Sequence, residues 1–182
     1  MRARTSLACA VVLLLGCGSP ADTDPRVLTG TLTIDARFSV DQRQSVLDAI
    51  DVWRDATGER FDPSVRIGEV SCGQPFALAA VSSEGCHVGQ TLDEGDSTGP
   101  IEKVLGAADP ERHSISVVTW LQGPDFGHNV EHELGHYLLL GHGQGIMAQS
   151  RDHQPAVVAA ASISEFCAIW TCDARGIRSA AK

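Results

Sequence analysis

Polar and apolar residues alternate in several short segments of the chain, as they do in strands that bury one face. Residues 27–38 (VLTGTLTIDARF) are rich in β-branched residues and predict a half-buried strand. Residues 64–70 (SVRIGEV) and 75–81 (PFALAAV) predict two further strands, which we expect to be central in the sheet. Residues 113–120 (HSISVVTW) predict the last strand. The apolar runs also contain three tryptophans that we expect in the core, Trp53, Trp120 and Trp170.

A helical period replaces this alternation in three places. The first helix begins after Ser39, which can form a capping box with Gln42, and it ends at Gly58. Its apolar face is formed by Val46, Leu47, Ala49, Ile50, Trp53 and Thr57. A second helix follows residues 121–127, and residues 156–170 are long enough for a closing helix. Strands before and between helices predict an α+β fold with a mixed sheet backed by helices.

The polar, glycine-rich segment from residue 82 to residue 109 predicts mostly loop, with one edge strand near residues 87–92. Asp93, Glu94 and Asp96 within it could hold a structural calcium ion. They lack the Asp-x-Asp-x-Asp-Gly order of a calcium loop, so we interpret the segment as a solvated acidic loop.

The N-terminus has the organisation of an export signal. Arg2 and Arg4 precede an apolar run at residues 7–15, which is shorter than the ~20 residues that a membrane-spanning helix needs. The run ends in Leu14-Leu15-Gly16-Cys17, which resembles the lipobox of bacterial lipoproteins and implies lipid attachment at Cys17. An ordinary cleaved signal with Cys17 as a free thiol is the alternative. We therefore expect an exported protein, anchored by its lipid to a bacterial membrane on the periplasmic or cell-surface side.

The rest of the chain is acidic and has the size of one domain. Removing Arg2 and Arg4 from the 14 basic residues leaves 12 against 23 acidic residues, a formal charge of −11. So acidic a surface argues against nucleic acid as a partner. The prediction is a signal peptide at residues 1–16, a tether at 17–26, one domain at 27–175 and a tail at 176–182. We expect a monomer.

Four cysteines lie beyond the signal and its lipobox: Cys72, Cys86, Cys167 and Cys172. In an exported chain two disulfides are the default expectation. Four cysteines allow three pairings, and proximity in the sequence favours Cys72–Cys86 and Cys167–Cys172. A zinc site made of all four is the alternative, which the wide spacing of the first two cysteines disfavours.

Residues 130–143 (VEHELGHYLLLGHG) hold three histidines and two glutamates, which an ordinary amphipathic helix does not need. His132 and His136 are four residues apart, so on a helix their β-carbons lie about 5–6 Å apart and both imidazoles can reach one metal ion. Glu133 can accept the proton of a water molecule that this ion activates. His142 would lie about 15 Å along a continuous helix from His132, so it can be a third ligand only if the chain turns sharply.

Residues 132–142 (HELGHYLLLGH) resemble the metzincin signature H-E-x-x-H-x-x-G-x-x-H, and VEHELGHYL is similar to the matrixin version of that helix. Metzincins are zinc endopeptidases. The resemblance implies three zinc ligands, a general base and a methionine turn beneath the metal: His132, His136 and His142, then Glu133, then Met147 in Gly-Ile-Met-Ala. It also implies a mixed, mostly parallel, twisted sheet of five strands, with an active-site helix, a backing helix and a C-terminal helix.

The function that this resemblance implies is hydrolysis of peptide bonds by a metal-activated water, with one catalytic zinc ion and Glu133 as general base. The substrate would be a protein or peptide that pairs in extended form with the edge strand of the sheet. The alternative is a catalytically inactive zinc-binding surface lipoprotein, or an interaction module, with the same fold. An intact Glu133 opposes this alternative, because a site that only holds metal does not need a general base.

Leu139 departs from the signature, because the family has glycine there to turn the backbone toward the third histidine. A leucine at positive φ costs roughly 1–2 kcal/mol. We therefore expect Gly141 to make the turn, in a left-handed cap that ends the helix at about Leu140.

That shift would change where His142 points. Three other side chains could then supply the third ligand: Asp152, His153 or Glu165. We interpret His128 and Glu131 as flanking surface groups.

Overall fold

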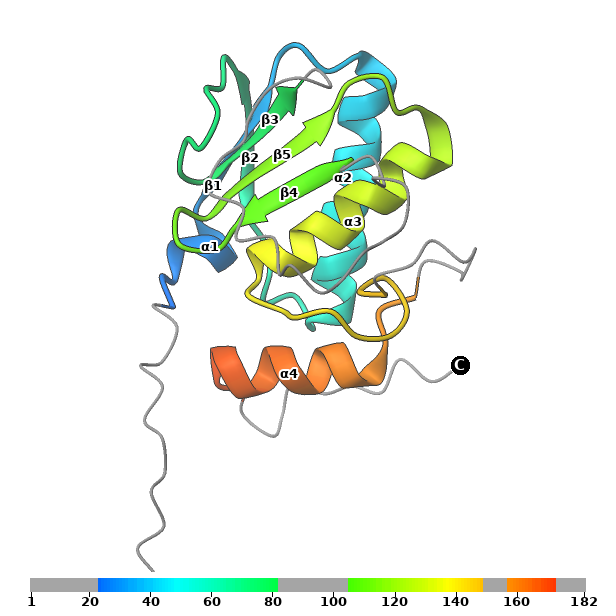
Figure 1. Ribbon diagram of the computed structural model, residues 1–182. Coiled ribbons are helices and arrows are strands. Elements are labelled where there is room, and N and C mark those ends of the chain that lie inside the picture. The colour runs from blue at the N-terminus through cyan, green and yellow to red at the C-terminus, as the bar shows by residue number, and fades with distance from the viewer. Residues whose placement is uncertain (1–22, 82–104, 149–156, 173–182) are drawn as a thin grey trace, which may run out of the picture.

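The computed structural model describes residues 23–81, 105–148 and 157–172, which form one sheet and the helices around it (Figure 1). The strands are β1 (Thr31–Asp35), β2 (Ser64–Gly68), β3 (Ala77–Val81), β4 (Gly106–Asp109) and β5 (Ser114–Val118). The helices are α1 (Arg26–Thr29), α2 (Val40–Ala56), α3 (Gly123–Tyr137) and α4 (Ala160–Trp170). The chain therefore has the predicted α+β fold.

The five strands of the described sheet lie in the order β2-β1-β3-β5-β4. β1 pairs in parallel with β2 and β3, and β3 pairs in parallel with β5, whereas β4 pairs antiparallel with β5. The sheet is therefore mixed and mostly parallel, as expected. α2 and α3 contact each other on one face of the sheet, and α3 contacts β4 and β5 (Figure 1).

Three details of the strand prediction were wrong. Residues 26–29 form a helical turn, so the first strand covers only residues 31–35 of the predicted 27–38. β2 is at one end of the strand order rather than in the centre, and it exposes Val65 and Ile67 at 37% and 48%. β4 was missed, because Gly-Ala-Ala-Asp contains no β-branched or aromatic residue. The strand expected at residues 87–92 lies outside the described residues, as do Asp93, Glu94 and Asp96.

α2 follows its capping signals closely, although Leu47 of its predicted apolar face is 36% exposed. The Ser39 hydroxyl accepts a hydrogen bond from the Gln42 backbone N–H (3.1 Å), and the Gln42 side-chain oxygen accepts one from the Ser39 N–H (3.0 Å). The helix ends at Ala56, and Gly58 follows at φ 63°. The Gln42 amide also donates to the carbonyl oxygens of Thr119 and Leu121, so the cap fastens α2 to the chain that follows β5.

A single large hydrophobic cluster fills the space between the sheet, α2, α3 and α4. Its largest fully buried side chains include Trp53, Phe61, Phe126, Tyr137 and Phe166. Trp53 and Trp170 are buried, as predicted, but Trp120 is 47% exposed. Trp120 comes after β5 has ended, where the chain has left the layer between sheet and helices.

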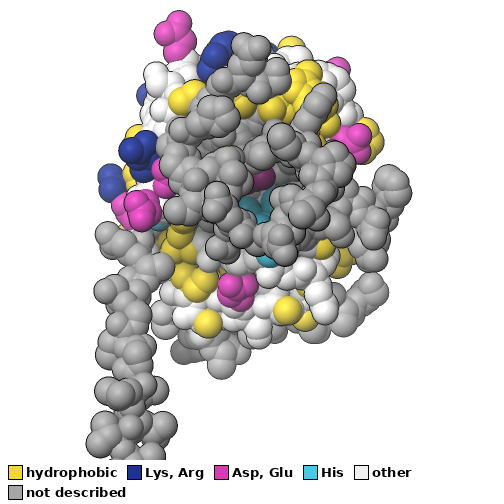
Figure 2. Space-filling view, viewed as in Figure 1, with side chains coloured by type: hydrophobic (Ala, Val, Ile, Leu, Met, Phe, Trp, Pro, Cys, Tyr) yellow, Lys and Arg dark blue, Asp and Glu magenta, His cyan; other side chains and the backbone are white. Residues whose placement is uncertain are grey.

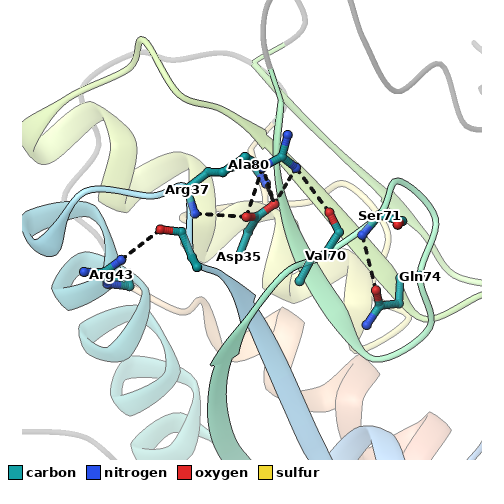
Figure 3. Close-up of polar contacts among 8 residues, drawn as sticks. Asp35, Arg37, Arg43, Val70, Ser71, Gln74 and Ala80 are labelled. Carbon is teal, nitrogen blue, oxygen red and sulfur yellow. Dashed lines mark hydrogen bonds and ion pairs between the residues drawn. The ribbon is translucent and has the colours of Figure 1, made fainter.

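A buried carboxylate fastens the carboxyl end of β1 to its neighbours (Figure 3). The side chain of Asp35 accepts hydrogen bonds from the backbone N–H of Ala80 in β3 (3.1 Å) and from that of Arg37 (3.0 Å). The Arg37 guanidinium pairs with the same carboxylate and donates to the carbonyl of Val70 (3.2 Å). Strands β1 and β3 and the loop around residue 70 are thus joined at one point.

Cys167 and Cys172 form a disulfide at the C-terminal end of α4, as predicted. Cys72 is also disulfide-bonded, and its predicted partner Cys86 lies outside the described residues. Cys17 and the predicted signal lie outside them as well. None of the helices in the described part of the chain has the length and apolar character needed to cross a membrane.

Candidate metal centre

One side of α3 faces the core, and another side carries two histidines. Its buried apolar residues are Phe126, Val130, Leu134 and Tyr137. The Trp53 indole N–H in α2 donates to the carbonyl of Glu131 (2.7 Å), which fixes the helix against α2. His132 and His136 remain half-buried one turn apart, so the anchored helix holds two imidazoles at the surface of the core.

The helix ends in a tight turn that reverses the expected role of Leu139 and Gly141. The N–H of Leu140 donates to the carbonyl of Gly135 (3.0 Å), and the N–H of Leu139 donates to that of His136 (2.9 Å). These two bonds define a Schellman motif, whose left-handed position falls on Leu139 at φ 69°. The prediction that Gly141 makes the turn was therefore wrong. Leu139 takes the conformation that the signature assigns to glycine, and its partly buried side chain packs on the core.

The turn brings His142 back to the two helical histidines. His136 Nε2 lies 3.1 Å from His132 Nε2 and 3.3 Å from His142 Nε2. Potential ligand atoms of the three residues lie within 4.8 Å of one another. Figure 2 shows histidine side chains near the middle of the face seen in Figure 1.

Backbone carbonyls select the tautomers of two of these histidines. His132 Nδ1 lies 2.8 Å from the carbonyl oxygen of Ile146, and His136 Nδ1 lies 2.8 Å from that of Leu140. A carbonyl oxygen can only accept, so each Nδ1 carries the proton and donates it. The Nε2 atoms of both rings are therefore unprotonated when the rings are neutral, with their lone pairs turned toward each other.

This donor set fits a bound metal ion. Two Nε2 lone pairs at 3.1 Å repel each other unless a cation lies between them. A proton is a poor candidate, since burial lowers the pKa of His136 to about 4 and keeps that imidazole neutral near neutral pH. Neutral imidazoles whose second nitrogen is hydrogen-bonded to a carbonyl are the usual form of histidine ligands. His132, His136 and His142 could therefore hold a metal ion.

Glu133 follows His132 on α3 and is buried. The residue is only 6% exposed, and burial raises the pKa of its carboxyl group to about 8. Gly106, the first residue of β4, makes room for it: a β-carbon there would lie 2.8 Å from Glu133 Oε1 and 2.6 Å from Asn129 Nδ2. Asn129 donates to the carbonyl of Leu105 (3.1 Å) and so holds the start of β4 against α3.

Met147 packs against the motif helix from the side of the core. It is fully buried, and a β-carbon on Gly135 would lie 2.1 Å from its Sδ. The turn that contains it is closed by a bond from the N–H of Ala148 to the carbonyl of Gly145, which has φ 63°. One short segment thus supplies both the thioether beneath the helix and, from Ile146, the carbonyl that orients His132.

Three other residues considered from the sequence, His128, Glu131 and Glu165, lie in the described part of the chain and do not join the cluster. His128 and Glu131 pair with each other at 3.2 Å, and the His128 side chain is 48% exposed. Glu165 accepts a hydrogen bond from the N–H of Gly141 (3.0 Å). Asp152 and His153 lie outside the described residues.

Sequence reasoning missed the residues that shape the site without binding anything. Two glycines leave room for functional side chains, Gly106 and Gly135, and Asn129 fixes the start of β4. The carbonyls of Leu140 and Ile146 orient the histidines. A glycine inside a helix pattern, at position 135, was the one available signal of close packing.

No protein-family model matches this chain, and no curated protein matches it either. The function must therefore be inferred from the chemistry of these residues.

Proposed function

We propose that this protein is a zinc-dependent endopeptidase of the metzincin type, with Glu133 as general base. The observation that carries the proposal is the convergence of three imidazole Nε2 atoms, two of them from the helix that also carries the buried Glu133. The buried methionine beneath that helix agrees with the resemblance in sequence. The five-stranded, mostly parallel sheet of the protein agrees with that resemblance as well.

Zinc suits these ligands, because imidazole nitrogens are among its usual donors. Ligand nitrogens about 2.0–2.1 Å from a tetrahedral zinc ion lie about 3.3–3.4 Å from each other. The Nε2 separations of 3.1 and 3.3 Å are close to that value. Three protein ligands also leave a coordination position open, as catalytic zinc sites require.

The chemistry divides between the metal and Glu133. A zinc ion held by the three histidines supplies Lewis acidity, which polarises a carbonyl and makes water more acidic. Glu133 accepts the proton of the attacking water and then delivers it to the leaving amine. Burial raises the pKa of this carboxyl group in the metal-free site, toward the range in which a group can both take and return a proton.

The substrate is a peptide in extended form. β4 is at one end of the described strand order, and its first residue, Gly106, lies against Glu133. A peptide that adds a strand beside β4 would therefore pass close to the general base. Export, lipid attachment at Cys17 and a monomeric state stay predictions from the sequence.

The test is cleavage of an unfolded protein by the purified, zinc-loaded chain, with and without a chelator. Glu133→Gln keeps the shape of the side chain and removes the base, so cleavage should fall at least ~100-fold while zinc stays bound. Glu131→Gln is the matched control on the same helix, since that carboxylate pairs with His128. Cleavage that survives the chelator or Glu133→Gln would overturn the proposal. A zinc-loaded protein that cleaves nothing would favour the binding module.

A further inference from the structure

The segment that connects His136 to His142 touches α4 at both of its ends. The Trp170 indole N–H donates to the carbonyl of Leu138 (2.9 Å) in a buried contact. The N–H of Gly141 donates to Glu165 Oε1 (3.0 Å). Glu165 and Trp170, which are five residues apart in α4, thus hold the two sides of the turn between His136 and His142.

Both contacts bear on the histidines. Leu140 lies between the two held positions, and its carbonyl accepts the hydrogen bond from His136 Nδ1. Gly141 directly precedes His142, so the position of its N–H fixes where the His142 side chain leaves the backbone. Leu139, at φ 69°, has a conformation that a leucine does not keep without support.

α4 is itself well anchored. Phe166 and Trp170 belong to the main core cluster, and the Cys167–Cys172 disulfide closes the C-terminal end of the helix. Before α4, Gly145 pairs with Val158 in an isolated β-bridge. Glu165 is itself exposed, but its carboxylate extends from a helix that the core and the disulfide hold in place.

We propose that Glu165 is a positioning residue of the metal centre, which acts through the backbone of Gly141 to place His142. The proposal rests on the proposed metal site. Among the described residues the potential ligand group consists of the three histidines without Glu165, whose Oε1 accepts the Gly141 N–H instead. A β-carbon on Gly141 would lie 3.4 Å from that oxygen, so the carboxylate and the turn are in close contact.

The test compares zinc affinity and the visible spectrum of the cobalt-substituted protein among three single variants. Glu165→Ala removes the acceptor, whereas Glu165→Gln retains a side-chain oxygen in the same place. Ser164→Ala changes the neighbouring exposed residue of α4 and is the control. Loss of an outer contact to a ligand commonly weakens metal binding 10–100-fold. We expect zinc binding to weaken by this factor, and the visible spectrum of bound cobalt to change, in Glu165→Ala alone.

A second arm asks whether Glu165 acts through His142. Glu165→Ala should have no further effect on zinc affinity in a His142→Ala background. In the metal-free protein it should also speed hydrogen exchange of the Gly141 amide. The proposal is overturned if Glu165→Ala binds zinc like the wild type, or weakens binding equally without His142. Because neither readout is cleavage, an inactive but zinc-binding protein would count against the proposed function and leave this inference standing.

Discussion

At the scale of single residues, Gly135 decides whether the motif helix and the methionine turn can pack together. In most helices Gly→Ala is stabilising by about 1 kcal/mol. Here the new β-carbon would lie 2.1 Å from Met147 Sδ and 3.0 Å from Trp53 Cζ2. We expect Gly135→Ala to lower the free energy of unfolding by about 1–3 kcal/mol. Zinc affinity should fall as well, because a displaced Met147 moves the neighbouring Ile146 carbonyl from His132. Urea unfolding and zinc titration measure the two effects.

Gly143→Ala is the control for this substitution. A β-carbon at position 143 meets no atom within 4 Å, so stability should change by no more than about 0.5 kcal/mol. Met147→Ala removes the two atoms nearest the new β-carbon and should restore much of the zinc affinity of Gly135→Ala. A Gly135→Ala protein more stable than the wild type would show that this packing is wrong.

Local patterns predicted which residues meet at the site, but not how the backbone brings them together. The spacing of His132 and His136 sufficed, since helix geometry alone sets their distance. Leu139 could not be predicted in the same way. Its propensity opposes a left-handed conformation, and only tertiary contacts, from Trp170 and the core to the turn, outweigh that preference. Local preference favoured Gly141 for the left-handed position, and that prediction was wrong.

At the scale of elements, the carboxyl end of β1 depends on the charge of Asp35. Burial raises the pKa of this carboxyl group, but hydrogen bonds from Arg37 and from the Ala80 N–H outweigh it, and the pKa is lowered overall. The folded protein thus binds the proton less readily than the unfolded chain. The stabilisation is complete above the ordinary value of 3.8 and is lost as the pH falls through the lower folded-state pKa.

Asp35→Asn should therefore destabilise the protein by about 1.5–3 kcal/mol at neutral pH, where a buried charged acceptor is lost. The difference from the wild type should shrink at pH values below about 4, where Asp35 becomes protonated in both states. Urea unfolding at several pH values measures it. Asp48→Asn, at an exposed position of α2, should change stability little at any pH. A difference that stays constant down to about pH 2 would contradict the argument.

Elements with strong local signals were predicted, and those defined by their partners were not. The capping box and apolar period of α2 are contained in the sequence itself. β4 exists because Gly106–Asp109 pairs antiparallel with β5, and its small residues fit beside Glu133 and Asn129. No property of those four residues taken alone distinguishes a strand from a loop.

At the scale of the whole molecule, the metal centre and the fold share one core. The hydrophobic cluster includes residues from the sheet, α2, α3 and α4. The site draws on the motif helix, the turn after it and the segment around Met147, which α4 supports from outside. Any ligand that holds the three histidines together therefore holds elements that the core already joins, so binding energy adds to the stability of the whole domain.

Zinc should consequently stabilise the entire described domain against unfolding. At a free zinc concentration about 100 times the dissociation constant, the gain is about 2.7 kcal/mol, which raises Tm by roughly 5–10 °C for a domain of this size. Far-UV circular dichroism and tryptophan fluorescence should show the same shift, because Trp53 in α2 and Trp170 in α4 report on the same core. A chelator should reverse the shift.

His132→Ala is the control. It removes a ligand and should abolish the response to zinc without unfolding the protein, since that ring is only half-buried. A shift seen by one probe alone would mean that the metal centre and α4 are not parts of one cooperative unit, and a full shift in His132→Ala would place the zinc elsewhere.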